Sequence, residues 1–172
     1  MQQQYENAKL NIRFATGKDI PQLNEILNYY IQNTVYSMSY SLRTKWGARQ
    51  WLQMHGDAYP LFVAEIGDKV VGWSSISMYR NTEGYAGSVE DSVYVHPDFR
   101  GMGIGRVLLK AALTAAQSNG YRTVIAFITS NNAASIGLHQ ALGFEKTGCL
   151  RQTGYKLNQV LDIDIMQYFV KI

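Results

Sequence analysis

A glycine-rich turn near the middle of the chain has the residue types of a phosphate-binding loop. Its sequence is "HPDFRGMGIGR", and its glycines are Gly101, Gly103 and Gly105. A dinucleotide-binding loop would need a glycine where Arg106 stands, and a P-loop would need Lys followed by Ser or Thr, so both patterns fail on spacing. Glycines still let backbone N–H groups turn inward, and a helix N-terminus near Ile104 would attract an anion. Because Arg100 and Arg106 flank the turn, we predict a site for a phosphorylated ligand. The alternative is a connection that only makes a tight turn.

Two further segments place polar side chains at regular spacing. The strand-like segment "SVEDSVYV" alternates, so that one face would carry Glu90, Ser92 and Tyr94 and the other Val89, Asp91, Val93 and Val95, unless a bulge intervenes. Taken alone, Glu90 is explained by a strand-edge carboxylate in solvent. Asn132, Ser135 or Ile136, and His139 recur at helical spacing and would share one helix face.

The elements that must position these residues alternate between strands and helices. Period-two or uniformly apolar segments predict strands at 10–14, 61–66, 70–78, 88–95, 123–128, 144–150 and 159–170. Helical spacing predicts helices that begin after Asp19, which we expect to cap the first of them, and that cover 45–55, 104–118 and 133–142. Short connections favour antiparallel neighbours, whereas the strand at 123–128 returns after a helix and should lie parallel to the one ending at Val95. The sequence predicts an α/β fold with a mixed sheet in one domain, residues 1–172.

Composition excludes several classes of protein. The 172 residues are 47% hydrophobic and 17% charged, with a formal net charge of +3. The sequence has no block of consecutive Lys or Arg residues, so it does not predict a nucleic-acid surface, although the positive net charge suits a small polyanion. Neither a signal pattern nor an apolar run of roughly 18 to 20 residues is present, so we expect no membrane segment and a cytoplasmic location. The single cysteine, Cys149, excludes an internal disulfide and a multi-cysteine metal site, and we expect no metal.

Three motifs together resemble one enzyme superfamily. The pattern R-x-x-G-x-G directly after a strand resembles the acyl-CoA pyrophosphate loop of the GNAT (GCN5-related N-acetyltransferase) superfamily, and "NNAASIGLHQALGF" resembles its second cofactor-side motif. The segment "VEDSVYVHPDFRGMGIG" is similar to the phosphinothricin or methionine sulfoximine acetyltransferase branch. This resemblance is dense from about Arg80 to Gln167. It implies a mostly antiparallel sheet of six to seven strands with a central parallel pair and helices on both faces.

The resemblance implies acetyl-CoA as co-substrate and assigns residues to it. The backbones of Val93, Tyr94 and Val95 would pair with the pantetheine arm as an added strand does. The pyrophosphate would lie on the turn, and Asn132 would contact the cofactor arm. The residues of the turn are Arg100, Gly101, Met102, Gly103, Ile104, Gly105 and Arg106.

The resemblance also implies catalytic and acceptor-binding roles. Glu90 matches the carboxylate that accepts the amine proton, and His139 stands where many members carry a Tyr thought to protonate the departing thiolate. A His packed on a helix face is the alternative for His139. Arg80 matches an Arg facing the acceptor's anionic group, although a solvated Arg at a strand end would look the same. Weaker candidates for the acceptor pocket are Asn81, Thr82, Asp91 and Ser92.

Two departures from the branch pattern limit the assignment of an acceptor. Val160 replaces a Trp beside the acceptor site, and Thr129 stands where some relatives have Glu, which puts phosphinothricin itself in doubt. We therefore predict acetyl transfer to the primary amine of a small amino-acid-like acceptor, by direct attack in a ternary complex, in a protein that the resemblance suggests is a homodimer. The rivals are a protein N-terminal acetyltransferase and a non-catalytic CoA-binding module.

Overall fold

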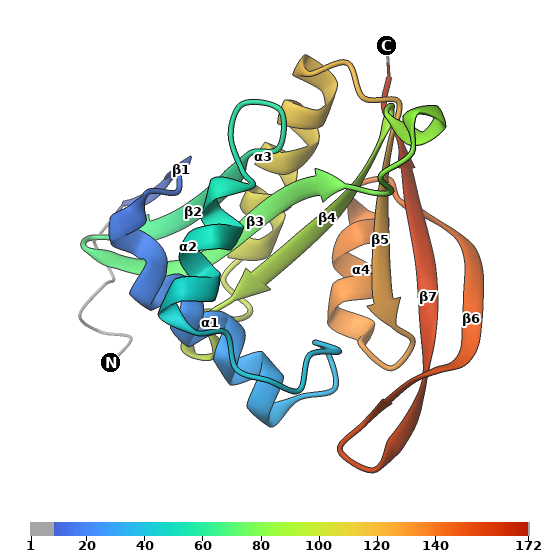
Figure 1. Cartoon of the computed structure of the whole chain (residues 1–172), viewed down its shortest axis with the longest axis horizontal. Helices are drawn as coiled ribbons and strands as arrows, with labels where there is room; N and C mark the ends of the chain where they lie inside the picture. The colour runs from blue at the N-terminus through green and yellow to red at the C-terminus, as the bar shows by residue number, and fades with distance from the viewer. Residues whose placement is uncertain (1–8, 172) are drawn as a thin grey trace.

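The computed structural model describes residues 9–171, and their strands form one sheet in the order β1-β2-β3-β4-β5-β7-β6 (Figure 1). The strands are β1 (Leu10–Phe14), β2 (Leu61–Ile66), β3 (Lys69–Met78), β4 (Ser88–Val95), β5 (Thr123–Thr129), β6 (Glu145–Lys156) and β7 (Gln159–Phe169). All neighbours pair antiparallel except β4 and β5, which are parallel. The predicted mixed sheet with a central parallel pair is confirmed.

Helices cover both faces of this sheet, as predicted (Figure 1). They are α1 (Ile20–Asn33), α2 (Lys45–Gln53), α3 (Ile104–Ser118) and α4 (Ala133–Ala141). On one face, Leu23 of α1 packs in a cluster with Val63 and Trp73. On the other, Leu108 of α3 packs in a cluster with Val71. The site therefore has to form where the sheet is interrupted, because both of its faces are occupied.

The entry into α1 corrects one detail of the sequence prediction. The apolar stripe faces the core as expected, and Pro21 lies in the first turn. Asp19 stands at the N-cap, but its carboxylate makes no capping bond to α1. It instead accepts from Arg13 and from the backbone N–H and hydroxyl of Thr16. A buried carboxylate takes a guanidinium partner because an ion pair with further hydrogen bonds offsets its loss of hydration.

Strand β6 is longer than the sequence predicts. The expected end near residue 150 was wrong, because the strand continues through polar residues to Lys156 with two register shifts against β7. Polar side chains are tolerated there because β6 is an edge strand. At Gln152, whose φ is 54°, the backbone N–H donates to the Asp162 carboxylate at 2.7 Å. This contact replaces a hydrogen bond between β6 and β7 that the register shift removes.

The parallel pair β4 and β5 is joined only at its beginning. Ser88, Val89 and Glu90 pair with Thr123, Val124 and Ile125, and no pairing follows although β4 continues to Val95 and β5 to Thr129. The two strands diverge in Figure 1. The inner edge of β4 beyond Glu90 thus leaves backbone groups free for a ligand.

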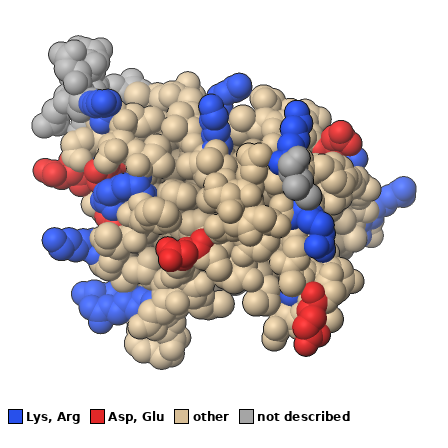
Figure 2. All heavy atoms as spheres, turned by 90° about the horizontal axis from the view of Figure 1, so that it is seen from above, with Lys and Arg blue, Asp and Glu red and all other residues tan. Residues whose placement is uncertain are grey.

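Basic and acidic side chains are mixed on the surface, in keeping with the small net charge of +3 (Figure 2). Figure 2 shows Lys and Arg side chains spread over one face of the molecule, with Asp and Glu side chains among them. None of the helices within residues 9–171 is long and apolar enough to span a membrane.

Candidate active site

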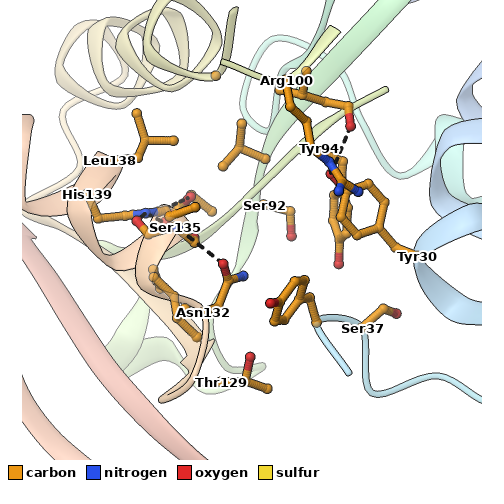
Figure 3. A pocket seen from close by; sticks show the side chains of 18 of the residues that line it. Tyr30, Ser37, Ser92, Tyr94, Arg100, Thr129, Asn132, Ser135, Leu138 and His139 are labelled. Atoms are coloured by element: carbon orange, nitrogen blue, oxygen red, sulfur yellow. Dashed lines mark hydrogen bonds and ion pairs between the residues drawn. The ribbon is translucent and has the colours of Figure 1, made fainter. Parts of the chain in front are cut away.

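A groove of about 820 Å³ occupies the split between β4 and β5 (Figure 3). Its walls come from β4, the glycine turn, the end of β5, the start of α4 and the segment after α1. The lining residues predicted from the sequence are Glu90, Asp91, Ser92, Val93, Tyr94, Val95, Arg100, Gly101, Gly103, Ile104, Gly105, Arg106, Asn132 and His139. The structure therefore brings most of the predicted site residues into one cavity, of the size that small-molecule sites have, about 300 to 1,000 Å³.

The glycine turn is built to receive an anion. Gly101 and Gly103 both have φ of +76°, a left-handed conformation that glycine adopts without steric cost. Gly103 is the N-cap of α3, and no acidic residue lies in the first turn of that helix. The free N–H groups at the N-terminus of α3 and the positive end of the helix dipole face the groove. Met102 does not line the groove and is about half exposed, so only its backbone could contribute.

Arg100 is held beside this turn by α1. Its Nε donates to the Tyr30 hydroxyl at 3.2 Å, and its guanidinium carbon lies 4.9 Å from the centre of the Tyr30 ring. The same hydroxyl donates to the carbonyl of Val95 at 2.8 Å. The Tyr30 hydroxyl thus links helix α1 to the glycine turn and to the end of β4.

Strand β4 places its side chains as the alternation predicts. Glu90 and Ser92 line the groove and share a face of β4 with Tyr94, which packs on Tyr30 and Trp73. Asp91 points to the opposite side, toward α4. The strand therefore separates Glu90 from the other carboxylate of the site, although the two are neighbours in sequence.

Glu90 is the carboxylate best suited to act as a base. It is partly buried, and no hydrogen bond or ion pair engages its carboxylate within residues 9–171. Burial, and after it the negative charge of Asp91, raises the pKa of Glu90 above the ordinary value for a glutamate. A raised pKa makes the carboxylate a better proton acceptor than an exposed Glu while it remains ionised.

His139 and Asp91 form a buried pair at the other wall. His139 Nε2 lies 3.2 Å from Asp91 Oδ2, and the exposed fractions of the two side chains are 2% and 1%. His139 Nδ1 lies 2.7 Å from the carbonyl oxygen of Ser135. Burial alone would lower the pKa of His139, but the hydrogen bond and charge of Asp91 raise it above the ordinary value. Both ring nitrogens are therefore occupied by protein groups.

Asn132 begins α4 and points into the groove (Figure 3). Its side-chain oxygen accepts from the backbone N–H of Ser135 at 3.2 Å, which caps the helix. Its amide nitrogen makes no hydrogen bond within the described part of the chain. It is free to donate to a ligand carbonyl.

The predicted anchor for an acceptor anion lies away from the groove. Arg80, Asn81 and Thr82 are exposed beyond the end of β3 and do not line the cavity. The Arg80 guanidinium lies over the rings of Tyr79 and Tyr85, at 5.2 and 5.7 Å from their centres. Their acceptor-binding role stays a prediction, since this chain alone does not bring them to Glu90.

Of the two departures from the branch pattern, only Thr129 reaches the groove. Its side chain is buried, and Oγ1 has no hydrogen-bond partner within residues 9–171. Figure 3 shows it at the cavity wall. Val160 is exposed on the β6–β7 hairpin and does not line the cavity.

The segment after α1 was not predicted to contribute to the site. Tyr36, Ser37 and Met38 line the groove, and no motif singles them out. Lys156 of β6 is buried and donates to the Ser37 carbonyl, and Tyr40 donates to the carbonyl of Tyr155. These long-range contacts hold the segment in place.

Other reactive groups lie elsewhere. Cys149 is exposed on β6, with its sulfur 3.9 Å from the Ser130 hydroxyl, and it does not line the groove. In the part of the chain that the structure describes, no group of His, Cys, Asp and Glu side chains could hold a metal ion.

Known proteins resemble this chain over nearly its whole length. The methionine sulfoximine/methionine sulfone acetyltransferase of Pseudomonas aeruginosa is 38% identical over 91% of this chain and 92% of its own. A structure from Salmonella typhimurium, solved with its cofactor acetyl-CoA, is 34% identical, covers 96% of each chain and has a TM-score of 0.93. A phosphinothricin acetyltransferase from Sinorhizobium meliloti in complex with acetyl-CoA is 33% identical over 94% of this chain and 88% of its own, with a TM-score of 0.89.

A family model agrees with these relatives. The model of the acetyltransferase (GNAT) family matches residues 24–144, which include β4, the glycine turn and α4. Both the whole-chain relatives and the fold point to the same group of enzymes. This chain belongs to the acetyltransferase (GNAT) family.

Proposed function

We propose that this protein is an acetyl-CoA-dependent N-acetyltransferase for the primary amine of a small amino-acid-like acceptor, of the methionine sulfoximine or phosphinothricin type. One observation carries the proposal: a single groove runs from an anion-binding turn, along the free edge of a strand, to a carboxylate with a raised pKa. The relatives that match nearly the whole chain support the same activity. Neither of these two relatives is named for a rival function.

The residues present fit acetyl-CoA. The diphosphate would lie on the left-handed glycines and the N-terminus of α3, with Arg100 and Arg106 adding charge. The pantetheine arm would lie along the free edge of β4 at Val93, Tyr94 and Val95. Asn132 has a free amide nitrogen for a carbonyl of that arm. When bound, acetyl-CoA supplies an acetyl group activated as a thioester.

In this proposal Glu90 prepares the acceptor. Its carboxylate takes a proton from the acceptor's ammonium group, directly or through a water, which frees the nitrogen lone pair to attack the thioester carbonyl carbon. The C–N bond forms, the C–S bond breaks, and the sulfur leaves as a thiolate. The attacking nitrogen loses a second proton as the amide forms, which balances the proton that the thiolate takes up. Cys149 lies outside the groove, which supports direct transfer over an acetyl-cysteine intermediate.

The acceptor end of the groove suits a small molecule. Tyr36, Ser37 and Met38 close it on one side, and Ser92 and Thr129 offer hydroxyl groups. Arg80 would have to approach from outside this cavity to meet an acceptor anion. We keep Arg80, Asn81 and Thr82 as proposed acceptor contacts on the strength of the family resemblance.

A thiol-release assay tests the proposal. Acetyl-CoA would be combined in turn with methionine sulfoximine, methionine sulfone, phosphinothricin, common amino acids and short peptides. We expect turnover on one of the amino-acid-like acceptors and a large loss in Glu90→Gln. Turnover on peptides alone would indicate a protein N-terminal acetyltransferase. Saturable CoA binding without turnover would indicate a binding module, and absence of CoA binding would overturn the assignment.

Three further proposals concern the protein's surroundings. A homodimer is supported by the family resemblance and by exposed apolar side chains on the β6–β7 hairpin, including Tyr155, Leu157 and Val160. Light scattering coupled to gel filtration measures it, and a monomer at micromolar concentration would contradict it. The mixture of basic and acidic side chains on the face in Figure 2 supports the absence of a nucleic-acid partner. Use of acetyl-CoA supports a cytoplasmic location without membrane attachment, which cell fractionation would test.

A further inference from the structure

Helix α4 contacts the sheet through one fully buried polar residue and through Ile136 and Leu138, which are only partly buried. It supplies Asn132, Ser135 and Leu138 to the groove wall, yet His139 is its only fully buried residue. Because these apolar side chains of α4 are only partly buried, a buried polar contact has a larger share in holding the helix. The contact between His139 and Asp91 is a buried polar link between α4 and β4.

The hydrogen-bond pattern of the pair defines where its protons lie. The Ser135 carbonyl can only accept, so His139 Nδ1 carries a proton. One further proton lies between His139 Nε2 and Asp91 Oδ2, whichever of the two atoms holds it. The ring nitrogen that would face a leaving group is thus already engaged by the carboxylate.

Asp91 keeps one oxygen unsatisfied at the groove. Its Oδ1 is buried without a hydrogen-bond partner within residues 9–171, and the residue lines the cavity. A buried carboxylate oxygen without a donor is costly. An N–H or O–H donor entering the groove between β4 and α4 would satisfy it.

We propose that Asp91 and His139 act together as a positioning pair for the cofactor arm: the pair locks α4 to β4 across the split, and Asp91 Oδ1 accepts a hydrogen bond from an amide or hydroxyl group of pantetheine. Asp91 then serves the cofactor side of the groove and not the acceptor. His139 acts through Asp91 and does not donate a proton to the thiolate. This inference rests on the proposed function, since it requires that the groove takes CoA.

Calorimetric titration with two probes tests the proposal. CoA carries the arm, whereas 3′-phospho-ADP carries the diphosphate and lacks the arm. In Asp91→Ala and His139→Ala we expect CoA to bind about tenfold more weakly, the effect of one lost hydrogen bond to a charged group. Binding of 3′-phospho-ADP should stay at the wild-type level. The double variant should bind CoA no more weakly than either single variant, because the two residues act as one unit.

Two variants separate positioning from general loss of stability. Asp91→Asn can donate to Nε2 and still accept through Oδ1, so it should restore CoA binding. Asp19→Ala breaks a partly buried ion pair away from the groove, and it should lower the melting temperature without changing CoA affinity. All titrations would be done well below the melting temperature of each variant.

The outcomes distinguish this inference from the proposed function. If wild-type protein does not bind CoA, the proposed function fails. If wild type binds but Asp91→Ala binds CoA equally well, or loses both probes equally, only the positioning pair is wrong. If His139→Ala keeps its CoA affinity but loses kcat and the alkaline limb of its pH profile, His139 is an acid and the inference is overturned.

Discussion

Arg100 donates to the hydroxyl of Tyr30, and that hydroxyl donates onward to the last carbonyl of β4. The two residues are 70 positions apart in sequence, so this relay joins the first helix to the glycine turn. Tyr30→Phe keeps the ring and removes both bonds. We expect it to lower the free energy of unfolding by about 1 kcal/mol and to weaken CoA binding severalfold.

Thermal unfolding and calorimetry would measure both effects of Tyr30→Phe. Tyr29→Phe is a matched control, because the Tyr29 ring also lies near Arg100, at 5.4 Å, while its hydroxyl makes no hydrogen bond within the described residues. Equal behaviour of the two variants would show that the relay does not matter.

Glu90→Gln should abolish most of the turnover while leaving CoA bound. Loss of a general base costs roughly a hundredfold or more in rate. In the wild type, kcat/KM should fall as pH drops through a pKa above the ordinary glutamate value, because only the ionised carboxylate accepts a proton. A pH–rate profile checks this; an acidic limb that persists unchanged in Glu90→Gln would assign it to another group.

The same raised pKa has a consequence for stability. A carboxyl group whose pKa is higher in the folded state binds protons more readily when folded, so its contribution to stability declines as pH rises. Glu90→Gln should therefore be no less stable than wild type at neutral pH. Denaturant unfolding at acidic and neutral pH measures this, and a variant that loses stability only at neutral pH would contradict it.

Gly103→Ala tests the geometry of the turn. With φ of +76°, an alanine there should cost about 1 kcal/mol of stability and move the first turn of α3 away from the diphosphate. Binding of 3′-phospho-ADP should weaken. Gly84→Ala, in an exposed turn with open space around the new Cβ, is the control and should change neither quantity.

The Arg13–Asp19 pair should set part of the acid sensitivity of the fold. Burial alone would raise the pKa of Asp19, but hydrogen bonds from Arg13 and Thr16 lower it below the ordinary value. The stabilisation by the Asp19 carboxylate is therefore complete above the pKa that this group has in the unfolded state. It is lost as pH falls through the lower pKa of the folded state. Asp19→Asn should cost about 2 kcal/mol at neutral pH and much less in acid. Equal losses at both pH values would contradict this.

Local patterns in the sequence were sufficient to predict much of the site. The alternation in β4 assigns Glu90 and Asp91 to opposite faces, and the glycine spacing indicates a phosphate turn, because both depend only on neighbouring residues. The order of elements was also sufficient for the mixed sheet. These features follow from backbone geometry, which short segments encode.

Long-range contacts were not predictable in the same way. Three contacts of the site join residues far apart in sequence. They are the pair of Asp91 and His139, the hydrogen bond from Arg100 to the Tyr30 hydroxyl, and the hydrogen bond from Lys156 to the Ser37 carbonyl. No pattern in a single sequence marks such pairs. The length of β6 was missed because polar residues on an edge strand look like a loop.

The short parallel pairing of β4 and β5 also bears on which parts of the protein exchange their amide protons. Beyond Glu90, the inner backbone groups of β4 have no partner strand, so a pantetheine arm would complete the sheet as a non-peptide strand. Amides that exchange freely without CoA should become protected with it, and heat stability should rise with ligand concentration. The hydrogen bonding of this sheet would thus be completed anew in each catalytic cycle, by the cofactor that the enzyme consumes.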